Sequence, residues 1–228
     1  MSDGIYLDND VVLKMCIYMF AEELILATTL NSLPPALLGV AKFTLRARVR
    51  RSKSIGNQEA VRSTLEVALA AARLVEPTEE EIELAAELEQ RAAGLGQEFD
   101  TGESQLVAML LKRESPLLIT GDKRAIRALS HIAPVELNCR LACFEQLIAT
   151  VILKFGHERL RTHVCAEPAT DRAITASFAC YSPTSTIQNV VEGLLSYVND
   201  IRKDADRLLI TTSDLSAVVS QEHGEGIA

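Results

Sequence analysis

The segment between residues 101 and 129 most constrains what this chain can fold into. A helical pattern ends at Ser115-Pro116, a compact apolar run follows at residues 117–120, and Gly121-Asp122 then opens a second short helix. A buried strand between two helices is the repeating unit of parallel α/β sheets. The sequence therefore predicts an α/β fold in which helices flank a parallel sheet.

The rest of the chain extends this architecture and ends in helices. The other predicted elements are a strand at 5–8, helices over 11–23, 57–75 and 78–94, an edge strand at 135–137, and helices over 138–155 and 186–208. Thr78 and Glu81 form a capping-box pattern at the start of their helix. We expect an α/β domain over residues 1–137 with a helical insertion at about 57–95, a helical extension over 138–210, and a disordered polar tail over 211–228.

Acidic residues occur where apolar runs meet helices. Asp8 and Asp10 follow the first predicted strand, Asp100 and Glu103 open a helix, and Asp122 follows the run at 117–120. Strand ends of the same polarity share one edge of a parallel sheet, so acids distant in sequence can meet there. Each position also has a purely structural explanation, because Asp and Glu commonly cap helices. Together they predict an all-oxygen site for Mg²⁺ or Mn²⁺.

A cluster of basic residues fits either a solvated strand face or contact with phosphate. Apolar and polar residues alternate over 42–50, which predicts an extended segment whose basic face carries Arg46, Arg48 and Arg50. Lys123 and Arg124, beside Asp122, are the other candidates for phosphate contact. The net charge of −8 argues against a protein that coats nucleic acid generally, but it allows a local basic groove.

Composition and cysteine usage indicate a protein of the cytoplasm. The chain has neither a basic N-terminal signal region nor an uninterrupted apolar run long enough to span a membrane, and we expect no membrane association. Its five cysteines are odd in number and include no C-x-x-C pair, so we expect them to stay reduced. The apolar stripe of the helix over 186–208 suits internal packing, a protein partner or a homodimer seam.

The acidic residues and their surroundings resemble the PIN-domain family of metal-dependent nucleases. The resemblance covers roughly residues 4–137, and it is most specific in the step from Glu103 to Asp122. It implies that Asp8, Glu103 and Asp122 are the catalytic, metal-binding acids, with Asp100 beside them. It also implies cleavage of RNA phosphodiester bonds by a metal-dependent endoribonuclease.

The family pattern includes one further acid, for which this chain offers only positional candidates. These candidates are Glu59, Glu66 and Glu145, of which Glu145 is expected at the surface.

Two other functions fit parts of the sequence. Asp8-Asn9-Asp10-Val11-Val12 is similar to the opening motif of haloacid-dehalogenase-type phosphatases, in which Asp8 would be a covalent nucleophile. That family's second acid beyond its Gly-Asp pair has no counterpart after Asp122. The remaining alternative is a noncatalytic PIN-like module that binds a protein partner.

Overall fold

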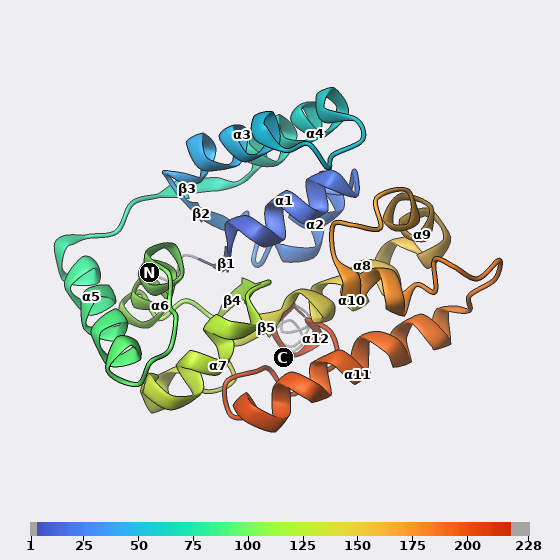
Figure 1. The fold of residues 1–228 in the computed structure, drawn as a ribbon. Helices are drawn as coiled ribbons and strands as arrows, with labels where there is room; N and C mark the ends of the chain where they lie inside the picture. Colours follow the sequence, from blue (N-terminus) through green and yellow to red (C-terminus); the bar gives the residue numbers. More distant parts are fainter. Residues whose placement is uncertain (1–3, 220–228) are drawn as a thin grey trace, which may run out of the picture.

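A five-stranded, all-parallel sheet lies at the centre of the protein, in the computed structural model that describes residues 4–219 (Figure 1). The strand order is β3-β2-β1-β4-β5. The strands are β1 (Ile5–Leu7), β2 (Ala36–Leu38), β3 (Arg73–Val75), β4 (Leu117–Thr120) and β5 (Leu141–Cys143). The predicted fold class is confirmed. Because β1 and β4 are hydrogen-bonded neighbours, with Leu7 opposite Ile119, the residues after these two strands lie side by side.

Helices cover both faces of the sheet, which is why the residues of β1, β2, β4 and β5 are all buried, whereas the edge strand β3 is partly exposed. Ile5 and Leu7 of β1 belong to one hydrophobic core, whereas Tyr6 belongs to the other. The first core takes in α1 (Asn9–Ile17), α2 (Ala21–Thr28), α3 (Ala41–Arg51), α4 (Gln58–Ala71), α8 (Phe144–Phe155), α9 (His157–Ala166) and α10 (Arg172–Ser177). The second takes in α5 (Glu79–Gly94), α6 (Thr101–Lys112) and α7 (Lys123–Ile132).

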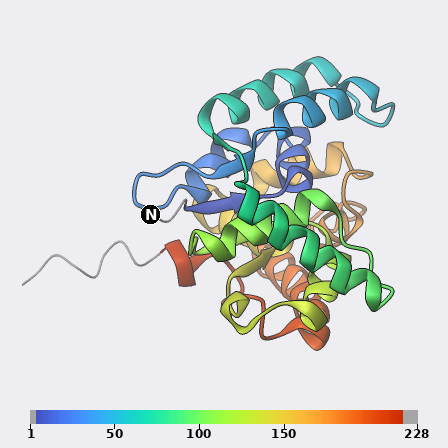
Figure 2. The same cartoon turned by 90° about the vertical axis from the view of Figure 1, so that its left-hand side faces the viewer.

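The long helix α11 (Ile187–Ala205) contributes to both cores, Val190 and Leu194 to the first and Val198 and Ile201 to the second. The apolar stripe of α11 is therefore buried within its own chain. Figure 2 shows α3 and α4 at one end of the molecule, and α7 and α11 at the other.

Several predicted elements are present as expected. β1, β4, α6 and α7 occupy the predicted places. The capping box of α5 is complete, because Thr78 Oγ1 accepts from the N–H of Glu81 and the Glu81 carboxylate accepts from the N–H of Thr78. The strong local signals in these segments agree with the tertiary structure.

Short strands account for most of the wrong predictions. The segment expected as a helix over 57–75 ends in β3, and the one over 138–155 begins with β5. Residues 135–137 form a 3₁₀ helix, η1 (Val135–Leu137), and not an edge strand. The helix expected over 11–23 is two helices, with Met19 at a positive φ of 62° between them. Strands of three residues are too short to show an alternating pattern.

The basic segment was predicted as a strand, but it forms the helix α3. Ala41, Leu45 and Val49 are buried at a spacing of four residues, which is the helical period. The alternating pattern arose because Phe43, an apolar residue, is exposed. Arg46 and Arg50 consequently lie on one side of α3, and Arg48 lies on another.

The C-terminal part packs onto the same sheet as the rest of the chain. β5 lies beyond residue 137, so the sheet extends past the expected domain boundary. Residues 211–219 are not a disordered tail: Leu215 is buried, and Gln146 Nε2 donates to the Thr212 carbonyl at 2.7 Å. They include the short helix α12 (Ser216–Val219). The remainder of the expected tail, residues 220–228, lies outside the described residues.

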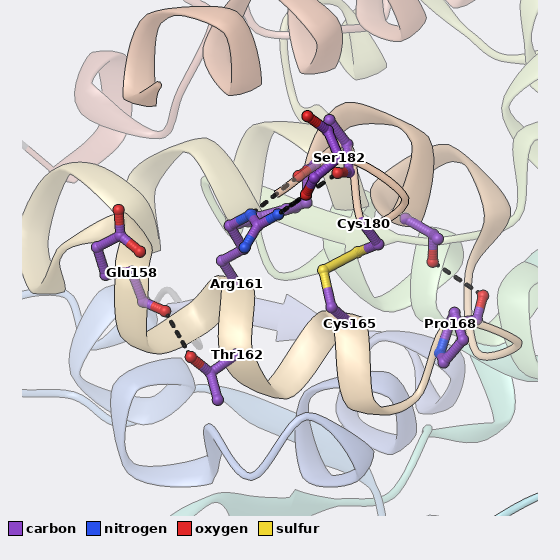
Figure 3. Close-up of a disulfide and its surroundings, with 10 residues drawn as sticks. Glu158, Arg161, Thr162, Cys165, Pro168, Cys180 and Ser182 are labelled. Carbon is purple, nitrogen blue, oxygen red and sulfur yellow. Dashed lines mark hydrogen bonds between the residues drawn. A yellow bond between two sulfur atoms is a disulfide. The ribbon is translucent and has the colours of Figure 1, made fainter. Parts of the chain in front are cut away.

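Two cysteines form a disulfide, which corrects the expectation that all five stay reduced. Cys165 of α9 and Cys180 are joined, with their Cα atoms 5.1 Å apart (Figure 3). Cys16, Cys139 and Cys143 are free. Within residues 4–219, no helix is long and apolar enough to cross a membrane.

Candidate functional site

The five predicted acids converge on one cleft of about 700 Å³ at the carboxyl edge of the sheet. Its acidic lining residues are Asp8, Asp10, Asp100, Glu103 and Asp122, and we call it the acidic cleft. They come from the starts of three helices, α1, α6 and α7, which follow β1, a long connection, and β4. The chain thus brings together carboxylates that are more than a hundred residues apart in sequence.

Asp8 and Asp122 are linked through the last residue of β4. The Thr120 hydroxyl donates to Asp8 Oδ2 at 3.4 Å. The oxygen of that hydroxyl, Thr120 Oγ1, accepts from the N–H of Asp122 at 3.0 Å. The N–H of Asp8 donates to the Ile119 carbonyl at 3.0 Å, which extends the β1–β4 pairing to the cleft. Sequence reasoning missed Thr120. The feature that could have indicated Thr120 is its hydroxyl at the end of a buried strand, directly before Gly121-Asp122.

The acids differ in how far helix capping explains them. Asp122 Oδ1 accepts from the N–H groups of Arg124 and Ala125, so this residue caps α7. Asp8 and Asp100 stand at the N-cap positions of α1 and α6, but neither side chain makes a capping hydrogen bond. Capping therefore accounts for Asp122 and leaves the carboxylates of Asp8 and Asp100 without that structural role.

Two of the carboxyl groups have raised pKa values. Burial, followed by the negative charges of Asp122, Asp8 and Asp100, raises the pKa of Glu103 from 4.5 to about 8. Burial and the charge of Asp10 raise the pKa of Asp8 to about 6, although the backbone N–H groups of Asn9 and Asp10, and then the charge of Arg48, act in the opposite direction. Repulsion of this kind is relieved by a proton or by a cation.

Asp122 keeps its charge more easily. Burial acts to raise its pKa, but the hydrogen bonds it receives from the Arg124 side chain and from the backbone outweigh that effect and lower the pKa. Arg124 Nη2 lies 3.1 Å from Asp122 Oδ2, and Arg124 Nη1 lies 3.0 Å from Glu98 Oε2. The cleft thus combines one carboxylate whose pKa is lowered with two whose pKa values are raised.

Asp10 is fixed differently from its neighbours. Its Oδ2 lies 2.6 Å from Lys14 Nζ, one helical turn away. A Cβ atom at position 121 would lie 2.4 Å from the same oxygen, so only glycine leaves room for the Asp10 carboxylate there. Asp10 therefore forms a wall of the acidic cleft, and Lys14 balances its charge.

The predicted basic residues are divided between different places. Arg48 and Arg124 line the acidic cleft. Arg46 and Arg50 line a second cleft of about 630 Å³ between α3 and α4, where Arg46 forms an ion pair with Glu66. Lys123 pairs with Glu145 Oε1 and stacks over the Tyr197 ring. Only two of the five predicted phosphate contacts therefore face the acids.

The candidates for a further acid lie elsewhere. Glu59 and Glu66 line the second cleft. Glu145 was expected at the surface but is buried, and its Oε2 has no hydrogen-bond partner among the described residues. None of the three lines the acidic cleft.

The donor set of the acidic cleft fits a hard divalent cation, because it consists of carboxylate oxygens whose charges repel one another. As the side chains stand, no three Asp, Glu, His or Cys groups within residues 4–219 are placed to hold a metal ion. The acids share a cleft and shift one another's pKa values, but their carboxylates are not close enough together to coordinate one ion.

Neither a protein-family model nor a curated protein nor a solved structure gives a significant match to this chain. The case for a function consequently depends on the residues and geometry of the acidic cleft.

Proposed function

We propose that this protein is a metal-dependent ribonuclease of the PIN-like type and that it hydrolyses RNA phosphodiester bonds in the acidic cleft. The observation that carries the proposal is the convergence of Asp8, Glu103 and Asp122, with burial and mutual repulsion raising the pKa of Glu103 to about 8. Buried carboxylates that are held close together despite their mutual repulsion commonly mark a functional site.

Asp8, Glu103 and Asp122 would hold Mg²⁺ or Mn²⁺, with Asp100 beside them. A divalent cation bound there supplies an activated water and neutralises charge on the leaving oxygen. Glu103 carries a proton at neutral pH in the free protein and must release it to act as a ligand. Thr120 holds the Asp8 carboxylate in place through its hydroxyl. Asp122 stays ionised and remains anchored to α7 by its capping hydrogen bonds.

The substrate path that we propose follows one side of α3. Thr44 and Arg48 line both the acidic cleft and an adjoining groove of about 660 Å³, which continues to Arg51. Thr44, Arg48 and Arg51 are spaced by four and three residues and so share one helix face. Arg48 and Arg51 are exposed and suited to contact successive phosphates, which sets affinity rather than sequence preference.

Cleavage of single-stranded RNA with and without divalent cations tests the proposal. We expect purified protein to cleave in Mn²⁺ or Mg²⁺ and to stop when EDTA is added. Asp122→Asn should abolish cleavage without unfolding α7, because an asparagine oxygen can still accept the two capping hydrogen bonds. Asp206→Asn, at an exposed carboxylate after α11, is the matched control and should keep full activity.

Two outcomes would contradict the proposal. One is cleavage by the purified protein that persists in EDTA and in Asp122→Asn, which would show that it needs neither a divalent cation nor the acidic cleft. The other is hydrolysis of p-nitrophenyl phosphate but not of RNA, with a phosphate group trapped on Asp8. That result would support the phosphatase alternative.

A further inference from the structure

An ion triad, buried at Lys14 and Asp171 and partly exposed at Asp10, joins the acidic cleft to the C-terminal part of the chain. Lys14 Nζ lies 2.6 Å from Asp10 Oδ2 and 2.8 Å from Asp171 Oδ2. The Lys14 side chain is only 14% exposed and that of Asp171 only 15%. Lys14 also lies over the Phe144 ring, 5.2 Å from its centroid. Because the charges of Lys14 and Asp171 are poorly hydrated in such surroundings, these two residues depend strongly on each other.

Both oxygens of Asp171 are committed. Oδ1 accepts from the N–H groups of Ala173 and Ile174, which begin α10, and this leaves Oδ2 for Lys14. The two hydrogen bonds to the backbone of α10 therefore fix the orientation of the Asp171 carboxylate. Lys14 in turn can bridge the two carboxylates only while α10 stays beside α1.

The segment that carries Asp171 is itself tied down. The Cys165–Cys180 disulfide closes the segment over residues 165–180, which we call the closed segment. Inside it, the Thr175 hydroxyl donates to the Pro168 carbonyl at 2.8 Å. Next to it, the Arg161 guanidinium donates to the carbonyl of Ser182 at 2.7 Å, as Figure 3 shows.

We propose that the closed segment positions Asp10 at the acidic cleft: Asp171 holds Lys14, and Lys14 holds the Asp10 carboxylate against Gly121. This gives the C-terminal part of the chain a role in the cleft, although none of its residues up to 219 lines it. Asp10 is thereby kept balanced by Lys14, while Asp8, Glu103 and Asp122 stay available for a cation. The consequence for cation binding rests on the function proposed above. The link from Asp171 through Lys14 to Asp10 is independent of that function.

Hydrogen–deuterium exchange in EDTA tests the link without metal or RNA. Asp171→Asn keeps an oxygen to cap α10 but removes the charge that holds Lys14. We expect faster exchange in the peptide that covers α1. Arg172→Gln, at the exposed neighbouring position, should leave exchange in α1 unchanged. The double variant Cys165→Ser and Cys180→Ser should also accelerate exchange in α1, because it opens the closed segment. Unchanged exchange in α1 in folded Asp171→Asn and in the double variant would overturn the proposal.

Manganese binding tests the consequence for the cleft. Asp171→Asn should raise the Mn²⁺ dissociation constant about threefold, since it removes a negative charge near the cleft and leaves Lys14 less neutralised. Lys14→Arg should keep wild-type affinity, because arginine can maintain the bridge, whereas Lys14→Gln should lose the bridge and show faster exchange in α1. A purely structural role would lower thermal stability in Asp171→Asn and leave Mn²⁺ affinity as in the wild type. If wild-type protein does not bind Mn²⁺, the proposed function fails while the exchange result still decides the link.

Discussion

Replacing Glu103 with glutamine should make the protein more stable at alkaline pH while destroying its activity. The pKa of Glu103 is raised from 4.5 to about 8, mainly by burial and then by the charges of Asp122 and Asp8. The folded state therefore holds the proton more tightly than the unfolded chain does. The resulting stability is complete below about pH 4.5 and is lost as the pH rises toward 8.

The size of the effect follows from the shift. At about 1.36 kcal/mol for each pKa unit, ionising Glu103 costs the folded state at most about 5 kcal/mol. Because the carboxylate faces an open cleft where water screens its charge, we expect about 2 kcal/mol. Glutamine keeps the shape of the side chain and carries no charge, so Glu103→Gln should recover this amount. In a chain of this length that corresponds to a rise of about 4–8 °C in melting temperature.

Urea unfolding in EDTA at pH 4 and pH 8.5 measures this difference. We expect Glu103→Gln to match the wild type at pH 4 and to exceed it by about 2 kcal/mol at pH 8.5. Glu81→Gln is a control of opposite sign, because hydrogen bonds from Arg113 lower the pKa of Glu81 and stabilise its charged form. It should destabilise the protein at pH 8.5. A Glu103→Gln protein no more stable than wild type at pH 8.5 would refute the account of the cleft as a site of repulsion.

Two further variants test the geometry around the cleft. Gly121→Ala should lower the cleavage rate about tenfold or more, since its Cβ would displace Asp10 Oδ2, while unfolding in urea changes by about 1 kcal/mol. Normal cleavage by this variant would show that the place of Asp10 is unimportant. Arg48→Gln should reduce the slope of log affinity for single-stranded RNA against log salt by about 0.7. Arg46→Gln should not change that slope, because Arg46 is paired with Glu66 in the second cleft, and equal slopes for both variants would argue against the proposed path.

Strong local signals made the central part of the fold predictable. The buried run of β4 between two helices, and the first strand followed by Asp8, were enough to predict a parallel sheet with acids at one edge. The strands β3 and β5 were missed because each adjoins a helical pattern in the sequence, and the pairing of β2, β3 and β5 depends on neighbours distant in sequence.

The basic residues show why a local pattern can mislead. The alternation around Phe43 favoured a strand, but burial of Leu45 and Val49 on one helix face determined the structure. The sequence predicted that these acids share one cleft because the parallel strand order brings the helix starts to one edge of the sheet. The side on which each arginine of α3 lies depends on the helical period, which the alternating pattern concealed. The Cys165–Cys180 pairing could not be deduced, since spacing does not reveal which cysteines meet.

The position of a bound cation tests the central claim most directly. A crystal of the protein soaked in Mn²⁺ would locate the ion by its anomalous scattering. We predict a single strong peak in the acidic cleft, within coordinating distance of the carboxylates of Asp8, Glu103 and Asp122 and absent from crystals of Asp122→Asn. Mn²⁺ bound only in the second cleft beside Glu59 and Glu66, or no peak at saturating Mn²⁺, would contradict the account.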